Sequence, residues 1–340
     1  MKTLKYNHPF LTESGASFPG VEIAYHTWGK LNEEGDNVIW VCHALTANSD
    51  VESWWPGMVG EGLVFDTQKY FVVCANILGS CYGTTGPLSI NPEKSGPWLN
   101  DFPVVTVRDV VRVHEILRKH LQINLIDTII GSSIGGYQAL EYSIMQSDIV
   151  QRLILIASNA KQSPWAIAFN ESQRLSIEAD ASFSENNREG GKKGLKAARS
   201  IALLSYRTAY AYTHSQAEET DEKTGSFRAS SYQAYQGDKL VNRFNPWSYY
   251  RLTQLSDSHN VGRGRGGVVN ALRQVKASTL CIGIKSDILF PVSEQKFVAE
   301  NVVRGQYSEL DSFFGHDGFL IETGKVSAII KKFRGHSTLK

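Results

Sequence analysis

Cysteine is scarce in this chain, and the few cysteines are not spaced as metal ligands are. The 340 residues include 4 cysteines, at Cys42, Cys74, Cys81 and Cys281, and they form no CxxC pair of the kind that zinc sites use. Most of them lie within apolar runs, so we expect reduced thiols in the core. A disulfide framework and a metal site are not expected.

The chain also lacks an excess of one charge and any long apolar run. Its 35 lysines and arginines against 34 acidic residues give a net charge of +1, too little to attract nucleic acid or an anionic membrane. No apolar stretch reaches the roughly 18 residues of a membrane span. The first residues, MKTLKYNHPFLTESG, contain no apolar segment typical of a secretory signal. These absences favour a globular cytoplasmic protein.

Short apolar runs alternate with longer mixed segments. Consecutive apolar positions are typical of strands buried on both faces, as in a parallel sheet covered by helices. Residues 107–122 and 135–146 have helical spacing between such runs. This alternation predicts an α/β fold with a mostly parallel central sheet. The predicted strands are 38–45, 71–78, 127–133, 152–158 and 279–285.

The alternation stops in the middle of the chain. Residues 161–268 are rich in polar residues and contain helical candidates but no convincing strand. A polar helical block between two strands is typical of a lid inserted at a loop. We therefore divide the chain into core residues 1–160, a helical lid at 161–268 and a second core part at 269–340.

A G-x-S-x-G motif stands where the predicted strand 127–133 meets the next helix. In a nucleophile elbow, this motif places a serine on a sharp turn, clear of the sheet. Glycine is needed at Gly131 and Gly135, where a side chain would meet neighbouring backbone. Ser133 is then the nucleophile, and the N–H of Ile134 can face a developing oxyanion at the start of the helix. The alternative, a plain tight turn, remains open for the motif alone.

A serine needs a base, and the base needs an acid that orients it. In this class of folds the chain order is serine, acid, histidine. Asp287 directly follows the predicted strand 279–285, and His316 follows the next strand-like run. His43 also stands at a strand end, but it precedes the serine. His114 is expected on a solvated helix face.

The segment after the first predicted core strand reads Cys42-His43-Ala44-Leu45-Thr46. The loop at this place supplies the second oxyanion N–H in such folds, and Leu45 can be that donor. The alternative is a buried Cys-His pair without a chemical role. Cys42 is disfavoured as a nucleophile because an apolar strand offers nothing that would lower its pKa.

Several segments in order along nearly the whole chain resemble the homoserine O-acyltransferases of the α/β-hydrolase type. They include AYHTWGKLN (24–32), VCHALTANSD (41–50), YFVVCANILGSCYGTTGP (70–87), GSSIGGYQALE (131–141), SYQAYQGDKLVNRF (231–244), SDILFP (286–291) and GHDGFL (315–320). Together they are far more specific than the elbow alone. The resemblance implies an acyltransferase that makes O-acetylhomoserine for methionine synthesis.

The resemblance also implies roles for single residues. Ser133, Asp287 and His316 would form a triad, and Leu45 and Ile134 an oxyanion hole. In the lid, Arg199 would bind the homoserine carboxylate with help from Tyr206, and Asp317 would pair with the homoserine ammonium. One cation and one anion suit an amino-acid substrate, because the planar guanidinium of arginine can bind both carboxylate oxygens. Acetyl-CoA would be a co-substrate, with no bound cofactor, and the resemblance implies a homodimer built through the lid.

The chain departs from the usual family pattern at the elbow itself. Ile134 stands where a methionine is more common, and Ser132 where a glycine is. The backbone donors survive such changes, but the acyl pocket need not. Succinyl-CoA as donor and L-serine as acceptor therefore stay open, since one methylene is worth only about 1–3 kcal/mol. An esterase with the same triad and a non-catalytic binding protein on this fold also stay open.

Overall fold

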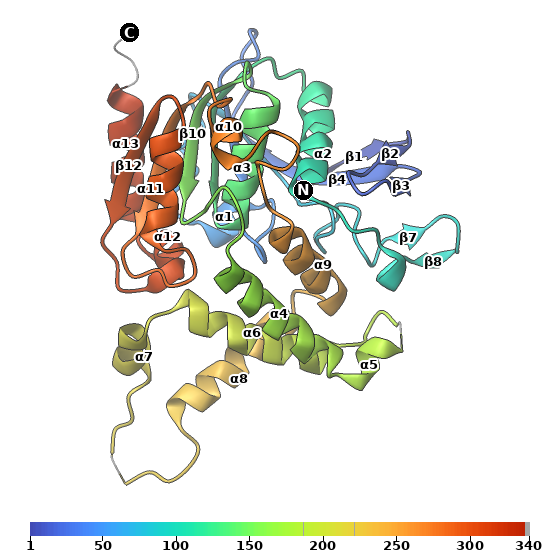
Figure 1. Ribbon diagram of the computed structural model, residues 1–340, viewed down its shortest axis with the longest axis vertical. Coiled ribbons are helices and arrows are strands. Elements are labelled where there is room, and N and C mark those ends of the chain that lie inside the picture. Colours follow the sequence, from blue (N-terminus) through green and yellow to red (C-terminus); the bar gives the residue numbers. More distant parts are fainter. Residues whose placement is uncertain (186, 221, 337–340) are drawn as a thin grey trace.

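The computed structural model describes residues 1–340 except 186, 221 and 337–340. An eight-stranded sheet with the order β1-β4-β6-β5-β9-β10-β11-β12 forms the centre of the molecule (Figure 1). The pairs β1–β4 and β4–β6 are antiparallel, and the pairs from β6 through β12 are parallel. The strands are β1 (Lys2–Tyr6), β4 (Val21–Trp28), β5 (Val38–Cys42), β6 (Phe71–Ala75), β9 (Ile126–Ser132), β10 (Val150–Ile156), β11 (Ser278–Ile284) and β12 (Gly305–Leu310). Two short hairpins lie outside this sheet, formed by β2 (Phe10–Leu11) with β3 (Ser17–Phe18) and by β7 (Ile90–Asn91) with β8 (Gly96–Pro97).

The mostly parallel sheet confirms the predicted fold class. The five predicted apolar runs overlap β5, β6, β9, β10 and β11, each of which is largely buried, with bounds that differ by up to two residues at the start of the strand. β1 was not predicted because its sequence, KTLKY, is polar and largely exposed at the edge of the sheet. Alternating exposure in an edge strand leaves no continuous apolar run to recognise.

Helices cover both faces of the sheet, and the side chains of each strand alternate between two cores. In β5, Val38, Trp40 and Cys42 belong to one core cluster, and Ile39 and Val41 belong to the other. The first cluster includes residues of α2 (Val107–His120), α3 (Ile134–Met145), α10 (Val268–Leu272) and α11 (Val292–Asn301). The second includes residues of α1 (Val51–Trp54), α12 (Gly318–Ile321) and α13 (Thr323–His336).

The prediction for His114 was wrong. α2 begins after Thr106, whose side chain and that of Asp109 form a capping box. His114 lies on the buried face of this helix, fully inaccessible, with its ring 5.7 Å from that of Trp40. Burial lowers the pKa of His114 to about 3, so the ring is neutral. The basic residues around it in the sequence concealed that it belongs to the apolar stripe.

The polar middle of the chain folds into a layer of helices at one end of the sheet (Figure 1). Its helices are α4 (Pro164–Glu178), α5 (Ala181–Ser184), α6 (Lys192–Tyr206), α7 (Ala209–Gln216), α8 (Arg228–Val241) and α9 (Pro246–Asp257). Ser163 caps α4 and Asn245 caps α9, each followed by proline at the first helical position. Where this layer joins the core, the N–H of Gln162 donates to His259 and the N–H of Val261 to Ala160. These bonds close a narrow neck, and the helices between its two sides form the lid.

The remaining features agree with a single folded core. Within the described residues, the four cysteines are free thiols, and three of them are buried. Burial raises the pKa of Cys42 well above its ordinary value, which makes it a poor nucleophile. In the part of the chain that the structure describes, no helix has the length and apolar character needed to cross a membrane.

Candidate active site

Ser133 stands on a strained turn between β9 and α3. Its backbone has φ +55° and ψ −129°, a conformation that side chains rarely adopt. The surroundings hold it there, because its N–H donates to the carbonyl of Ile156 at 3.0 Å and its carbonyl accepts from the Ser158 hydroxyl at 2.9 Å. The turn leaves the Ser133 side chain at the wall of a cavity.

The glycines of the motif are required by close backbone contacts. A Cβ at Gly131 would lie 2.0 Å from the carbonyl oxygen of Gly135, and one at Gly135 would lie 2.2 Å from the carbonyl oxygen of Cys42. A Cβ at Gly136 would lie 2.3 Å from the Ser158 hydroxyl, so the start of α3 packs directly against the end of β10. The spacing of the motif therefore follows from the geometry of a strand that turns at once into a helix.

His316 and Asp287 form a buried pair near Ser133. His316 Nδ1 lies 2.7 Å from Asp287 Oδ2, with the two side chains 4% and 0% exposed. Asp287 follows β11, and its other oxygen accepts the N–H groups of Leu289 and Phe290 at 2.8 and 3.0 Å. These bonds fix the carboxylate, which in turn fixes the tautomer of the imidazole, with the proton on Nδ1 and Nε2 available as a base.

The pKa of His316 is raised above its ordinary value. Burial alone would lower this pKa, but the charge and the hydrogen bond of Asp287, followed by the charge of Asp317, more than offset it. Within the described chain, Ser133 and His316 share the cavity wall without a hydrogen bond between them. Such bonds are often long in ligand-free enzymes and tighten when substrate binds.

His43, the other histidine at a strand end, has a structural position. Its Nδ1 lies 2.9 Å from the carbonyl oxygen of Ala44, and its Nε2 accepts the N–H of Ile77 at 3.1 Å. Burial lowers the pKa of His43 to about 4, so it stays neutral and supports the loop that carries Leu45. This arrangement uses both ring nitrogens within the fold.

The cavity beside Ser133 has a volume of about 350 Å³, in the range of small-molecule sites. The core contributes Ser133, His316, Asp317 and Leu45 to its wall. Ile134 is buried and does not line the cavity with its side chain, but its N–H is the first of α3 and has no intrahelical partner by geometry. The two expected oxyanion donors are thus the N–H of Ile134, beside the nucleophile, and the N–H of Leu45, in the loop that also lines the cavity.

The lid contributes Arg199 and Tyr206 from the same face of α6. The Arg199 guanidinium lies 5.5 Å from the centre of the Tyr206 ring, a cation–π distance. The Tyr206 ring lies 5.6 Å from the His316 ring. Burial raises the pKa of Tyr206, so its hydroxyl stays protonated. The structure therefore places Tyr206 next to the predicted base, and Arg199 beside Tyr206 in the same cavity wall.

Asp317 has a partner that the sequence did not indicate. Its Oδ2 lies 2.8 Å from Nε of Arg207, the residue that ends α6. Arg207 follows Tyr206 directly, so one segment of the lid contacts both His316 and Asp317. Arg207 is adjacent in sequence to Tyr206, which was already a candidate site residue. Nothing in the sequence, however, indicated that Arg207 pairs with a carboxylate more than a hundred positions away.

Two further lid cations line the cavity, Lys239 of α8 and Arg243 just after it. They stand four residues apart in the sequence, and both line the cavity although Arg243 lies beyond the end of the helix. Both lie in segment 231–244, which resembles the homoserine O-acyltransferases, but nothing in the sequence indicated a role for either of them. Among the residues that the structure describes, no three His, Cys, Asp or Glu side chains are grouped as metal ligands.

Comparisons with known proteins agree with this geometry. The family model of the alpha/beta hydrolase fold matches residues 37–320. A homoserine O-acetyltransferase from Cyclobacterium marinum is 48% identical over 321 residues, covering 94% of this chain and 91% of that protein. A crystal structure of homoserine O-acetyltransferase from Bacillus anthracis superposes with a TM-score of 0.90 at 25% identity, covering 98% and 97% of the two chains. The esterase E22 also superposes with a TM-score of 0.90, at 21% identity and 98% coverage of both chains, which shows the shared fold. This chain belongs to the homoserine O-acetyltransferase family of the α/β-hydrolase fold.

Proposed function

We propose that this protein transfers an acetyl group from acetyl-CoA to the side-chain hydroxyl of L-homoserine, a step of methionine biosynthesis, through an acyl-Ser133 intermediate. The observation that carries the proposal is the composition of one cavity. Ser133 and His316 share its wall with a lid cation, Arg199, and a core anion, Asp317. An acyl-transfer triad and a pair of opposite charges fit an amino-acid acceptor.

In the first step, His316 Nε2 takes the proton of Ser133 as its oxygen attacks the thioester carbonyl. The N–H groups of Leu45 and Ile134 stabilise the oxyanion, and one such donor is typically worth about 3 kcal/mol. The C–S bond breaks, the CoA thiolate takes the proton from His316, and the acetyl group stays on Ser133. Asp287 holds the imidazole and stabilises its charged form throughout.

In the second step, the homoserine hydroxyl gives its proton to His316 and attacks the acetyl carbon, and Ser133 leaves with the proton returned. Arg199 would bind the carboxylate of homoserine. The ion pair with Arg207 engages Oδ2 of Asp317, so the ammonium group can bind through Oδ1. The lid matters because an acyl-enzyme open to water hydrolyses, whereas a positioned acceptor competes by its effective concentration.

A matrix of donors and acceptors tests the proposal. Acetyl-CoA and succinyl-CoA are each combined with L-homoserine, L-serine or no acceptor, and CoA release and the O-acyl product are both measured. We expect the acetyl-CoA and homoserine pair to give the highest kcat/KM. Higher rates with succinyl-CoA or with serine would correct the donor or the acceptor. If CoA is released but no O-acetylhomoserine forms in the presence of homoserine, the protein hydrolyses the thioester and is an esterase.

We also propose a homodimer that forms through the lid. Leu175 of α4, Leu204 of α6 and Tyr235 of α8 expose 55%, 56% and 60% of their surface, and exposed apolar side chains on the lid fit a surface that a second copy covers. Light scattering during gel filtration tests this, with a mass near 75.6 kDa expected from twice the 37.8 kDa chain. A mass of one chain at micromolar concentration would contradict it. The expected cytoplasmic location remains a prediction that cell fractionation can test.

A further inference from the structure

The loop that carries Leu45 is a tight turn with a two-residue tip. The N–H of Ala47 donates to the carbonyl of Ala44 at 3.0 Å, which places Leu45 and Thr46 at the tip. The base of the loop is fixed on both sides. His43 Nδ1 holds the carbonyl of Ala44 at 2.9 Å, and Asn76 accepts the N–H of Ser49 at 2.8 Å. What fixes the tip is therefore a separate question.

Arg243 reaches this tip from the lid. Its Nη1 donates to the carbonyl oxygen of Thr46, and its Nη2 lies 3.3 Å from Thr46 Oγ1. Nη1 also donates to the Tyr82 hydroxyl at 2.9 Å. The next residue, Phe244, is 4% exposed and packs edge-on against the Tyr82 ring at 5.7 Å. The backbone that carries the guanidinium is thus anchored in the core, and the side chain crosses to the turn.

The contacts of Arg243 are directed at neutral groups. Within the described residues, no carboxylate lies within 4.0 Å of its guanidinium, and the hydrogen bonds that other segments make to Leu45 and Thr46 come from Arg243. A charged donor on a backbone carbonyl is one of the stronger hydrogen bonds of proteins. It restrains the peptide that follows Thr46, and through the closed turn it restrains the orientation of the Leu45 N–H.

We propose that Arg243 is a positioning residue, which holds the oxyanion turn in register with Ser133 and makes the oxyanion hole depend on the lid being in place. The inference rests on the proposed role of Leu45 as an oxyanion donor, not on the identity of the acceptor. It gives the lid a part in the chemistry of the first step, in addition to its contacts with homoserine. Arg243 does not touch the reacting atoms in this account.

The test compares Arg243→Met and Arg243→Lys with the unchanged protein on two acyl donors. One donor is acetyl-CoA with homoserine, and the other is p-nitrophenyl acetate, which has no phosphate and needs no acceptor. Without Arg243 we expect the Leu45 N–H to shift by well under 1 Å from its position in the oxyanion hole. A shift of this size predicts a fall in kcat of roughly tenfold for Arg243→Met. We expect this fall with both donors, KM values within about twofold, and partial recovery in Arg243→Lys.

Arg251→Met is the matched control. Arg251 is another lid arginine that donates to a backbone carbonyl, that of Asn100 at 2.7 Å, but it does not line the cavity. We expect its kcat with p-nitrophenyl acetate to stay unchanged. Thermal unfolding of each variant shows whether the lid still folds. If Arg243→Met fails to fold, the comparison of Arg243→Lys with the unchanged protein still tests the proposal.

Two outcomes would overturn the proposal. If Arg243→Met raises the KM for acetyl-CoA and leaves ester hydrolysis unchanged, Arg243 binds the phosphates of the donor instead. If neither donor is affected, its bonds to the turn have no role in catalysis. Because ester hydrolysis needs only Ser133, His316 and the oxyanion hole, this arm remains informative even if transfer to homoserine is not found.

Discussion

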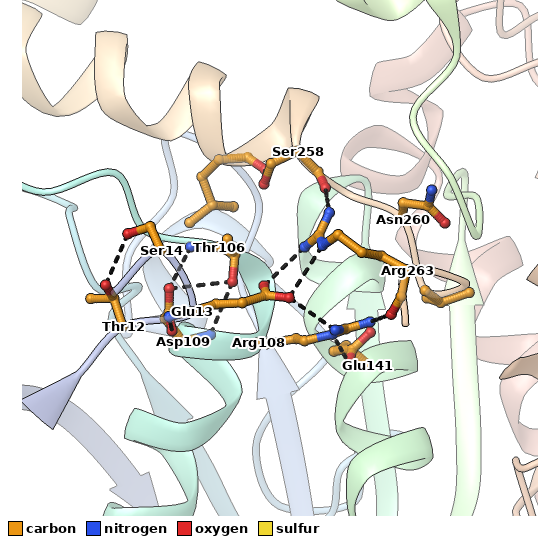
Figure 2. Close-up of polar contacts among 12 residues, drawn as sticks. Thr12, Glu13, Ser14, Thr106, Arg108, Asp109, Glu141, Ser258, Asn260 and Arg263 are labelled. Atoms are coloured by element: carbon orange, nitrogen blue, oxygen red, sulfur yellow. Dashed lines mark hydrogen bonds and ion pairs between the residues drawn. The ribbon is translucent and has the colours of Figure 1, made fainter. Parts of the chain in front are cut away.

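Two clusters of arginines in this protein differ in how their charges are balanced. The first surrounds Glu13 and Glu141, where the β2–β3 hairpin, α2, α3 and the segment after the lid meet (Figure 2). Arg108 lies 2.9 Å from Glu13 and 3.1 Å from Glu141, and Arg263 lies 2.9 Å from Glu13. Arg265 lies 2.5 Å from Glu141. Each arginine therefore has a carboxylate partner.

The second cluster lines the cavity. Within the part of the chain that the structure describes, Arg199, Lys239 and Arg243 have no carboxylate within 4.0 Å. Asp317, which shares the cavity, is paired with Arg207. The cavity thus has positive charge that the protein itself does not neutralise.

The difference distinguishes charges that stabilise the fold from charges that can bind a ligand. Arg199 is half-buried, and Lys239 and Arg243 are exposed, so solvent screens much of the charge that no carboxylate balances. The network around Glu13 ties four distant segments together. In the cavity, Arg199 and Lys239 remain available to an anionic ligand, whereas Arg243 is engaged with the turn at Thr46. The comparison predicts that variants of the first cluster lose stability and variants of the second lose activity.

The largest stability effect is expected for Glu141→Gln. The Glu141 side chain is 2% exposed and lies between Arg108 and Arg265. Glutamine keeps the size but leaves Arg265 without its carboxylate and Arg108 with Glu13 alone, so we expect a loss of about 3 kcal/mol in the free energy of unfolding. Urea unfolding measures it, and kcat per folded molecule should stay within about twofold because the network does not reach the cavity.

Asp148→Asn is the control for this change. Asp148 pairs with Lys276 at 2.6 Å, but its side chain is 82% exposed, so its removal should leave the unfolding curve unchanged. If Glu141→Gln instead lowered kcat and left stability unchanged, the network would belong to the chemistry and the comparison would fail.

For Arg199→Met we expect the opposite result, a loss of activity without a loss of stability. Losing a bidentate charged contact predicts a fall in kcat/KM for homoserine of roughly 100-fold. Thermal stability should not fall, because no carboxylate loses its partner. Hydrolysis of p-nitrophenyl acetate should continue, since it needs no acceptor. Lys196→Met, on the same helix but paired with Asp238 at 2.8 Å outside the cavity, should change neither quantity.

The sequence predicted the parts of the site whose position along the chain determines their position in space. Ser133, Asp287 and His316 each follow a strand, and the carboxyl ends of parallel strands meet at one edge of the sheet. The motif also indicated its glycines, although the carbonyl that a side chain at Gly135 would meet belongs to Cys42, in a distant segment of the chain. The fold class followed from the apolar runs of the buried strands.

The charge partners could not be predicted in the same way. Arg263 and Glu13 stand 250 positions apart, and Arg243 and Thr46 stand 197 apart. Both arginines lie in polar stretches where any of several neighbours could have turned inward. Whether a carboxylate neutralises an arginine depends on which segment the folded lid and hairpin bring beside it. His114 shows that even the helix face on which a residue lies can be predicted wrongly from its neighbours in the sequence.

A smaller effect on stability is expected at Glu13 and should depend on pH. Burial alone would raise its pKa, but the hydrogen bonds of Arg263 and Thr106 and then the charges of Arg263 and Arg108 lower it from 4.5 to about 2. The lowered pKa stabilises the fold above pH 4.5, and this contribution is lost as the pH falls toward 2. Because the carboxylate is partly exposed and screened, Glu13→Gln should cost only about 1 kcal/mol at pH 7. Urea unfolding at pH 7, 4 and 3 should show the difference shrinking, and a difference that grows toward low pH would contradict this assignment.

The smallest effect concerns how the charges beside His316 set its pKa. His316 must be neutral to act as a base, so its raised pKa moves the acidic limb of the rate profile above the ordinary histidine value. Asp317→Asn removes one cause of the rise, and should move the acidic limb of p-nitrophenyl acetate hydrolysis to lower pH. Arg207→Met removes the partner of Asp317, and should move the limb the other way. Opposite shifts would show that the Arg207–Asp317 pair tunes the pKa of the base, whereas equal limbs in both variants would leave that pKa to Asp287 alone.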